Sequence, residues 1–239
     1  MNPKLCVFDV EVSPILGWAY QLYDTNLIHV ERDQHMMSWS AKVGRKITTR
    51  TLPDYELYKK EPYNDRELVK EFHQLINEND LYVGHNLDRF DIRITQARML
   101  EHGFSPPSPL RTVDTLKIAR KHFKFSSNKL GDLAERLGVG KKTYEKHSDL
   151  WRDCLSGDMK AWEKLRRYNK RDVVLTDRVY LKLRPWIQNH TPLSNNPLKC
   201  PNCGEKNLQK RGTYITRKSK LQRLCCQSCG AWTKGDKII

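Results

Sequence analysis

The sequence predicts an α/β domain with a mixed β-sheet flanked by helices, followed by a small β-rich domain that binds a metal. Strand-like segments come first in the chain, and helical segments then alternate with short apolar strands, which is typical of the first domain. Five of the seven cysteines lie between Cys200 and Cys229, which predicts the second. A chain of 239 residues is long enough for one sizeable core and an appendage.

The first predicted strand, residues 5–12, carries two acids inside an apolar, β-branched run. Strand side chains alternate, so Asp9 and Glu11 share one face and Val10 lies on the other. Two like charges at the end of a buried strand are costly unless a cation neutralises them. The alternative is a strand whose polar face meets solvent, and the pair alone does not decide between the two.

The remaining elements of the first domain are predicted from hydrophobic spacing and from turn and cap residues. Residues 36–43 and 46–52 form strands around a Gly44-Arg45 turn, and Asn64 and Asp65 cap a helix that runs to residue 77. Further strands are predicted at 81–84 and 111–115, and further helices at 91–102, 116–123, 130–137 and 157–183, with a break near Asn169 in the last. We expect the domain to span residues 1–188, with a linker at 189–196 and the second domain at 197–239.

The charge balance points to a polyanionic partner. Lys and Arg number 43 against 28 acids, which gives a net charge of +15, and residues 196–239 hold ten of these cations and two acids. Nucleic acid is the leading partner class, whereas a solubilising charge and an anionic membrane surface are the alternatives. No run of about 18 apolar residues occurs, so no membrane span is expected. The first residues lack the layout of a signal peptide, so we expect a cytoplasmic protein, in the host cytoplasm if it is virus-encoded.

Three further residues extend the pair of acids. Asp91 follows a buried strand, and Tyr168 and Asp172 lie four apart in the long predicted helix, so they share a helix face. Leu165 and Leu175 fall on or near that face, which is therefore buried. A carboxylate that faces inward needs a partner.

These residues fall into three ordered motifs, D-x-E, N-x-x-x-F-D and Y-x-x-x-D. They read Phe8-Asp9-Val10-Glu11, Asn86-Leu87-Asp88-Arg89-Phe90-Asp91 and Tyr168-Asn169-Lys170-Arg171-Asp172. The set resembles the DnaQ-like 3′–5′ exonucleases, which have a ribonuclease H-like fold and are named DEDD for four metal-binding acids. The resemblance covers about residues 4–187, and residues 157–168 are similar to virus-encoded members.

The resemblance implies a role for each matching residue. Asp9 would bridge two Mg²⁺ or Mn²⁺ ions, Glu11 and Asp172 would complete one site, and Asp91 would hold the other ion. Tyr168 would orient the attacking water or help to deprotonate it. Two such ions can stabilise both the attacking and the leaving oxygen of a phosphodiester. Magnesium prefers hard carboxylate oxygens, which fits these acids.

Neighbouring residues have less specific interpretations. Asp88 is the alternative to Asp91 as the metal-binding acid of the second motif, but the motif spacing and the preceding Phe90 favour Asp91. Asp114 more readily fixes a strand end than binds metal. The histidine subclass of the family carries its histidine five residues before the last acid, where this chain has Arg167, so the tyrosine subclass fits.

The cysteines form two C-x-x-C-G units, Cys200 with Cys203 and Cys226 with Cys229, separated by 22 residues. This spacing predicts one structural Zn²⁺ held by four thiolates, and the segment resembles a zinc ribbon. Cys225 is an alternative zinc ligand to Cys226, but three residues separate it from Cys229, which fits the C-x-x-C spacing less well. Basic residues with nearby aromatics predict a nucleic-acid-binding ribbon, and a purely structural cap is the alternative. The residues expected to contact nucleic acid are Asn86, Lys141, Lys142, Arg211, Arg217, Lys218 and Arg223.

The sequence therefore predicts a two-metal 3′–5′ exonuclease that releases nucleoside 5′-monophosphates, with DNA slightly favoured over RNA. Its substrate would be single strands or 3′ ends, and a replication or repair protein is a further expected partner. A structure-specific endonuclease of ribonuclease H-like type is the second hypothesis. A non-catalytic nucleic-acid-binding or recruitment module is the third.

Overall fold

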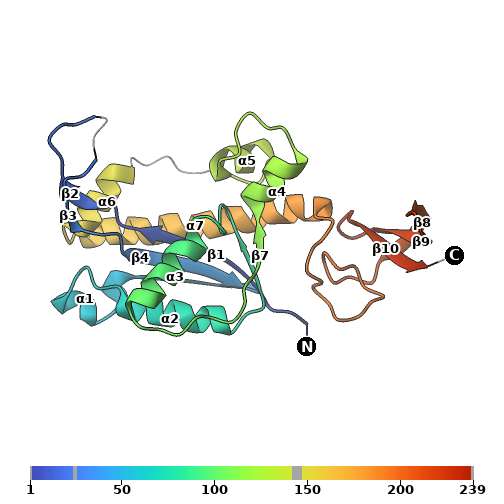
Figure 1. The fold of residues 1–239 in the computed structure, drawn as a ribbon, viewed down its shortest axis with the longest axis horizontal. Helices are drawn as coiled ribbons and strands as arrows, with labels where there is room; N and C mark the ends of the chain where they lie inside the picture. Colours follow the sequence, from blue (N-terminus) through green and yellow to red (C-terminus); the bar gives the residue numbers. More distant parts are fainter. Residues whose placement is uncertain (1, 24–25, 142–146, 238–239) are drawn as a thin grey trace.

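The first domain is built around a five-stranded sheet in a computed structural model that describes residues 2–23, 26–141 and 147–237 (Figure 1). The strands of this sheet are β1 (Leu5–Val12), β4 (Met36–Val43), β5 (Lys46–Thr51), β6 (Leu81–Gly84) and β7 (Arg111–Asp114). They lie in the order β5-β4-β1-β6-β7. β1 runs antiparallel to β4 and parallel to β6, so the sheet is mixed and β1 is its central strand.

Helices cover both faces of this sheet, which confirms the predicted fold class (Figure 1). The helices are α1 (Leu57–Lys60), α2 (Arg66–Asn77), α3 (Asp91–Glu101), α4 (Thr115–His122), α5 (Leu130–Arg136), α6 (His147–Leu155) and α7 (Met159–Leu183). Helix α2 lies on one face with α3 against it, and α7 crosses the other face with α4, α5 and α6 packed beside it. Single 3₁₀ turns occur at Leu52–Asp54 and Arg184–Trp186.

The two faces of β1 are chemically different. Phe8 and Val10 pack into the core beneath α2, where the Phe8 and Phe72 rings meet edge to face at 5.1 Å. Val7 packs on the opposite face, in a cluster with Val173 of α7. Asp9 and Glu11 share the face of Val7 because side chains alternate along a strand. The strand therefore directs both acids toward α7.

Two local predictions differ from the structure, and three short elements were not predicted individually. Helix α7 runs without a break through Asn169, whose side chain bonds to neighbouring elements instead of competing for its own backbone. Asp65 stands at the N-terminus of α2 but makes no capping hydrogen bond, because its carboxylate is engaged elsewhere. Asn64, the other predicted cap, does accept a hydrogen bond from the N–H of Arg66, the first residue of the helix, at 3.1 Å. Two short strands, β2 (Leu16–Trp18) and β3 (His29–Arg32), and helix α6 were not predicted.

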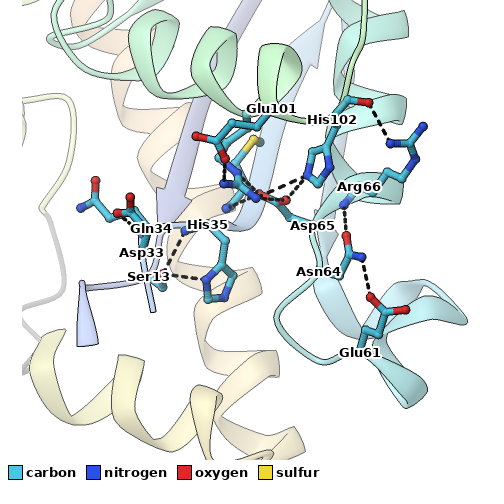
Figure 2. A network of polar contacts seen from close by, with 12 residues as sticks. Ser13, Asp33, Gln34, His35, Glu61, Asn64, Asp65, Arg66, Glu101 and His102 are labelled. Carbon is cyan, nitrogen blue, oxygen red and sulfur yellow. Dashed lines mark hydrogen bonds and ion pairs between the residues drawn. The ribbon is translucent and has the colours of Figure 1, made fainter. Parts of the chain in front are cut away.

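The Asp65 carboxylate joins three segments of the first domain (Figure 2). Fully buried, it accepts hydrogen bonds from the backbone N–H of Met36 at 2.7 Å and from Arg98 at 2.8 and 2.9 Å, and it contacts His102 at 2.5 Å. Burial alone raises the pKa of Asp65, but the hydrogen bonds from Arg98 and His102 outweigh it and hold the pKa below its usual range. The network ties the start of α2 to the end of α3 and to the start of β4.

The second domain is a three-stranded antiparallel sheet. Its strands are β8 (Leu208–Ile215), β9 (Lys220–Cys226) and β10 (Trp232–Lys237), in the order β10-β9-β8. Asn202 is buried and donates hydrogen bonds to the carbonyls of Arg184 and Ile187 at 2.8 and 2.9 Å, directly beyond the end of α7. The second domain therefore contacts the turn that follows the helix crossing the first domain.

The segment between the domains is also packed. His190 is buried and its Nε2 lies 2.7 Å from the hydroxyl of Tyr180 in α7, while Leu193 packs against the core cluster under the sheet. None of the helices in the described residues combines the length and the apolar content needed to cross a membrane.

Candidate active site

Three acids from two elements meet at the end of β1. One carboxylate oxygen from each of Asp9, Glu11 and Asp172 lies within 4.8 Å of the other two. Asp172 is buried on the face of α7 that covers the sheet, whereas Asp9 and Glu11 are partly exposed. Three carboxylates this close repel one another unless a cation lies between them. Oxygen-only ligands of this kind suit Mg²⁺ or Mn²⁺.

Asp91 lies beside this cluster but outside it. It is the first residue of α3, only 3% exposed, and its Oδ1 accepts a hydrogen bond from the backbone N–H of Val10 at 3.1 Å. Val10 stands between the two strand acids, so the Asp91 carboxylate is attached to the same strand. Burial raises the pKa of Asp91 to about 7, and the nearby Asp114 adds to the rise. A cation near this carboxylate would favour its charged form.

Tyr168 lies one helical turn before Asp172 and faces the same acids. Burial raises the pKa of its phenol above the usual range, and the charges of Asp172, Glu11 and Asp9 raise it further. The hydroxyl therefore keeps its proton at neutral pH and acts as a hydrogen-bonding group. The ring of Trp151 meets the Tyr168 ring edge to face at 6.0 Å. This contact fixes the position of the phenol.

Asn169 is a positioning residue that the sequence analysis missed. Fully buried, it donates from Nδ2 to the Asp9 carboxylate at 2.7 Å and to the Asp9 carbonyl at 3.2 Å. Its Oδ1 accepts a hydrogen bond from Ser38 of β4 at 3.2 Å. Helical spacing could have identified this residue, because Asn169 precedes Asp172 by three residues and therefore lies on the same face of the helix. The amide holds the Asp9 side chain toward α7.

A polar cavity of about 820 Å³ opens beside the acids. Asp9 and Asp172 line it, and the segment that leads into α5 contributes a further wall with Ser127, Asn128 and Lys129. This wall also was not predicted. The cavity offers hydroxyl, amide and ammonium groups within one enclosure that ends at the carboxylates.

Asn86 lines the same cavity and has a backbone φ of 65°, the one positive value outside glycine in the described residues. Non-glycine residues rarely adopt this conformation, and it often marks a functional site. The Asp114 carboxylate holds it by accepting hydrogen bonds from the backbone N–H groups of Asn86 and Asp88 at 3.0 and 3.3 Å. Asp114 also caps α4 through Leu116 at 3.0 Å, which agrees with the predicted structural role. The Asp88 carboxylate pairs with Lys117 at 2.7 Å.

Comparison with known proteins places this geometry in a family. The family model of the RNase H superfamily matches residues 30–184. The chain belongs to the RNase H superfamily. The match begins after β1, so the Asp9–Glu11 pair lies outside it, while Asp91, Tyr168 and Asp172 lie within it.

Two individual proteins are similar to parts of the chain. Protein NEN3 of Arabidopsis thaliana is 34% identical over 73 residues, which are 29% of this chain and 14% of NEN3. The family B DNA polymerase of the archaeon Pyrobaculum calidifontis is structurally similar, with a TM-score of 0.59 and 19% identity. That similarity covers 78% of this chain and 25% of the polymerase, and it shows a shared fold.

Outside the RNase H domain, four cysteines converge in the second domain. Cys200, Cys203, Cys226 and Cys229 form one cluster, with Sγ–Sγ distances of 3.8 Å between Cys200 and Cys229 and 3.6 Å between Cys203 and Cys226. A tetrahedral zinc site with Zn–S bonds of about 2.3 Å requires sulfur atoms about 3.8 Å apart. The four thiols therefore fit Zn²⁺. Cys226 belongs to this cluster and Cys225 does not.

Glycines shape both turns that carry these thiols. Gly204 and Gly230 have φ values of 77° and 80°, a region that side chains disfavour. Their N–H groups donate to the carbonyls of Cys200 and Cys226, each at 2.8 Å. The glycine after each second cysteine therefore permits a tight turn at this point of the chain.

The basic residues predicted to bind nucleic acid lie in two places. Arg211, Arg217, Lys218 and Arg223 are exposed on the second domain. The Arg223 guanidinium lies 5.0 Å from the centre of the Trp232 ring, and Lys234 lies 4.2 Å from that of Tyr214. Lys141 is exposed beside α5 and pairs with Glu135 at 2.9 Å. Lys142 lies outside the described residues.

A divalent cation is expected to stabilise the RNase H domain against heat. Mg²⁺ that binds the folded acids and not the unfolded chain adds about 1.4 kcal/mol for each tenfold excess over its dissociation constant. We expect 10 mM Mg²⁺ to raise the melting temperature by about 2–4 °C per kcal/mol gained. Differential scanning fluorimetry with and without added Mg²⁺, in a buffer free of chelators so that the cysteine cluster keeps its metal, measures this shift.

Two substitutions test whether the shift in melting temperature comes from the clustered acids. Glu11→Gln removes one of the three clustered carboxylates and should abolish most of the Mg²⁺ shift. Asp88→Asn removes an acid that pairs with Lys117 and should leave the shift intact. Equal shifts in the wild type and in the Glu11 variant would show that the cation binds elsewhere.

Proposed function

We propose that the chain is a metal-dependent 3′–5′ exonuclease of the DnaQ-like DEDD class, tyrosine subclass. It hydrolyses phosphodiester bonds of nucleic acid, with DNA slightly favoured over RNA, and releases nucleoside 5′-monophosphates. The observation that carries the proposal is the meeting of Asp9, Glu11 and Asp172 within 4.8 Å, with Tyr168 on the same face of α7. Membership of the RNase H superfamily supports it.

The acids fit the metal ions that such a reaction uses, because they are hard, charged and close together. Asp9, Glu11 and Asp172 would hold one ion, and Asp9 and Asp91 would hold a second. Bound there, the cations would activate water and neutralise charge on the phosphate. Asn169 keeps the Asp9 carboxylate in place through its 2.7 Å hydrogen bond.

Tyr168 orients the attacking water in this proposal. Burial raises the pKa of its phenol, so the protonated hydroxyl can position the water by a hydrogen bond. The polar cavity beside Asp9 receives the terminal nucleoside, whose hydroxyl groups can bond to Asn86 and Asn128. One Zn²⁺ on the four cysteines stabilises the second domain, the zinc ribbon.

The zinc ribbon, residues 197–239, adds affinity for the strand. Its exposed cations and the rings of Tyr214 and Trp232 suit phosphate binding and base stacking. Its contact with the end of α7 through Asn202 keeps it beside the nuclease domain, residues 1–188. The packed segment 189–196 joins the two.

End-blocked oligonucleotides test the proposed activity. Labelled DNA and RNA strands are incubated with the wild-type protein and Mg²⁺, with a 3′ block, a 5′ block or a closed circle. We expect nucleoside 5′-monophosphates from free and 5′-blocked strands, and no product from 3′-blocked or circular strands. Cleavage of the circle would favour an endonuclease, and binding without any cleavage would favour a recruitment module.

A further inference from the structure

One flank of helix α7 carries only basic side chains at its exposed positions. The helix contains eight cations and three acids, and six of the cations recur at spacings of three, four or seven residues. Such spacings place side chains on one face of a helix. These six exposed residues form the basic flank: Lys160, Lys164, Arg167, Arg171, Arg178 and Lys182. At about 1.5 Å of rise per residue, the row is about 33 Å long.

The three acids of α7 lie on other sides of the helix. Asp172 faces the sheet and belongs to the candidate active site. Glu163 pairs with Arg166 at 3.2 Å, and Asp177 pairs with Lys42 of β4. Each of these two acids directly precedes a member of the basic flank, so it lies about 100° around the helix from the row. The charges of α7 are therefore sorted by face.

The basic flank keeps its charge available to a partner. Arg171 and Arg178 donate to the backbone carbonyls of Lys141 and Val139, which are uncharged acceptors. In the part of the chain that the structure describes, no acid forms an ion pair with the other four members, Lys160, Lys164, Arg167 and Lys182. An exposed row of cations of this length attracts a polyanion.

The composition of the basic flank indicates which polyanion fits. Proteins that grip single strands add aromatic rings on which the bases stack, but the six exposed positions hold Lys and Arg and no ring. Helices that lie on membranes expose an apolar face, whereas the apolar face of α7 packs on the sheet and on α5. A duplex presents phosphates on its outside and hides its bases, so it matches a surface that offers charge alone.

The length and the position of the basic flank fit a duplex beside the acids. About 33 Å corresponds to about ten base pairs, or one turn, at about 3.4 Å per base pair. Helix α7 is continuous over 25 residues and a short duplex is stiff, so neither has to be ordered on contact. Arg167 and Arg171 directly precede Tyr168 and Asp172, so the middle of the row borders the site. Figure 1 shows the second domain beyond the C-terminal end of α7.

We propose that the basic flank of α7 binds the phosphate backbone of a nucleic-acid duplex whose 3′ end reaches the acids at the end of β1. This assignment rests on the proposed exonuclease function and specifies its substrate as a 3′ end carried by a duplex. The six side chains contact phosphates along the duplex and none of the reacting atoms, so their contribution can be measured as binding, without hydrolysis.

The test compares the wild type with the triple variant Lys164→Gln/Arg167→Gln/Lys182→Gln. Glutamine has a helix propensity similar to that of lysine and arginine, so α7 should persist. Labelled 20-base-pair DNA and RNA duplexes and their single strands are titrated by fluorescence anisotropy, in chelator-free buffer without added Mg²⁺. We expect the variant to bind the duplex at least tenfold more weakly and the single strand less than about threefold more weakly.

Salt dependence counts the phosphates that are lost. Each phosphate contact contributes about 0.9 to the slope of log K against log salt for a duplex, so the slope should become shallower by about 2.7 in the triple variant. The duplex, DNA or RNA, that shows this change is the one that the basic flank binds. A slope that stays the same for both duplexes would overturn the proposal.

The matched control removes three exposed cations that lie outside α7. In Arg45→Gln/Lys60→Gln/Lys70→Gln the net charge falls from +15 to +12, as it does in the flank variant. A loss of affinity caused by overall charge alone would be the same in both variants. We expect the control to bind the duplex within about twofold of the wild type. Equal losses in the two variants would refute a localised duplex site.

Other outcomes separate this inference from the proposed function. A wild type that binds the duplex through the basic flank but releases no nucleotide in Mg²⁺ would refute the exonuclease assignment and uphold the binding surface. If hydrolysis occurs, the flank variant should raise KM for the 3′ end of the duplex at least tenfold with kcat unchanged. Equal losses for duplex and single strand would overturn the duplex assignment. Weaker binding to vesicles of anionic phospholipid, with duplex binding unchanged, would identify a membrane surface instead.

Discussion

Replacing Asp9 with asparagine is expected to lower phosphodiester hydrolysis about a thousandfold or more. Asp9 is the strand acid that faces both Glu11 and Asp172, and it is fixed by Asn169. Asparagine keeps the size of the side chain and can still accept the Asn169 hydrogen bond, but it removes the charge that a divalent cation requires. A thousandfold loss corresponds to about 4 kcal/mol of transition-state stabilisation, a magnitude typical of metal-ion catalysis.

Single-turnover hydrolysis of a labelled oligonucleotide in Mg²⁺ measures this effect. Circular dichroism and anisotropy should show an unchanged fold and binding within a few-fold of the wild type. The control is Asp88→Asn, which removes the other acid of the Asn86–Asp91 motif and should retain most of the activity. If the Asp9 variant keeps more than a tenth of the wild-type rate, the acids at the end of β1 are not the catalytic centre.

The part of this site that the sequence could predict is the part set by local periodicity. Alternation in β1 places Asp9 opposite Val10, and helical spacing places Tyr168 on the face of Asp172. Both patterns depend on the backbone of one element, so a single sequence contains them. The order of the strands depends on pairing between distant segments, which no local pattern contains, whereas a mixed sheet is typical of chains in which strands precede alternating helices and strands.

The parts that the sequence did not reveal depend on contacts between distant segments. Asn169 looked like a helix breaker because asparagine has low helix propensity, yet its bonds to Asp9 and Ser38 hold it inside α7. Asp65 matched the pattern of a helix cap, but Arg98, 33 residues away, engages its carboxylate instead. Helix α6 supplies Trp151, whose position beside Tyr168 no local pattern indicates.

Replacing Arg98 with methionine is expected to destabilise the protein by about 3–5 kcal/mol at neutral pH. The Arg98 side chain is 13% exposed and makes two hydrogen bonds to the fully buried Asp65 carboxylate. Methionine fills a similar volume without a charge, so the carboxylate would lose its main counterion. Urea unfolding, with the midpoint and slope compared between variant and wild type, measures the loss.

The pH dependence of that loss identifies its cause. The pKa of Asp65 in the folded protein lies below its value in the unfolded chain, so its contribution is present above about pH 4 and is lost as the pH falls through the folded pKa. The gap between wild type and Arg98→Met should therefore shrink at acidic pH, where Asp65 is protonated in both. A gap that stays constant down to about pH 3 would assign the effect to packing rather than to the buried charge.

The matched control is Arg152→Met, at an exposed arginine of α6 that pairs with Asp149 and Asp153. An exposed pair contributes about 0–1 kcal/mol, so this variant should unfold near the wild-type midpoint. The Asp65 network also matters for the candidate active site. It joins α3, which begins with Asp91, to the start of β4, which carries Ser38. In a variant without this network, α3 and the start of β4 are no longer held together, so Asp91 and the Ser38 that bonds to Asn169 lose their fixed positions. Such a variant should therefore lose Mg²⁺-dependent hydrolysis at a lower urea concentration than the one that unfolds the whole domain.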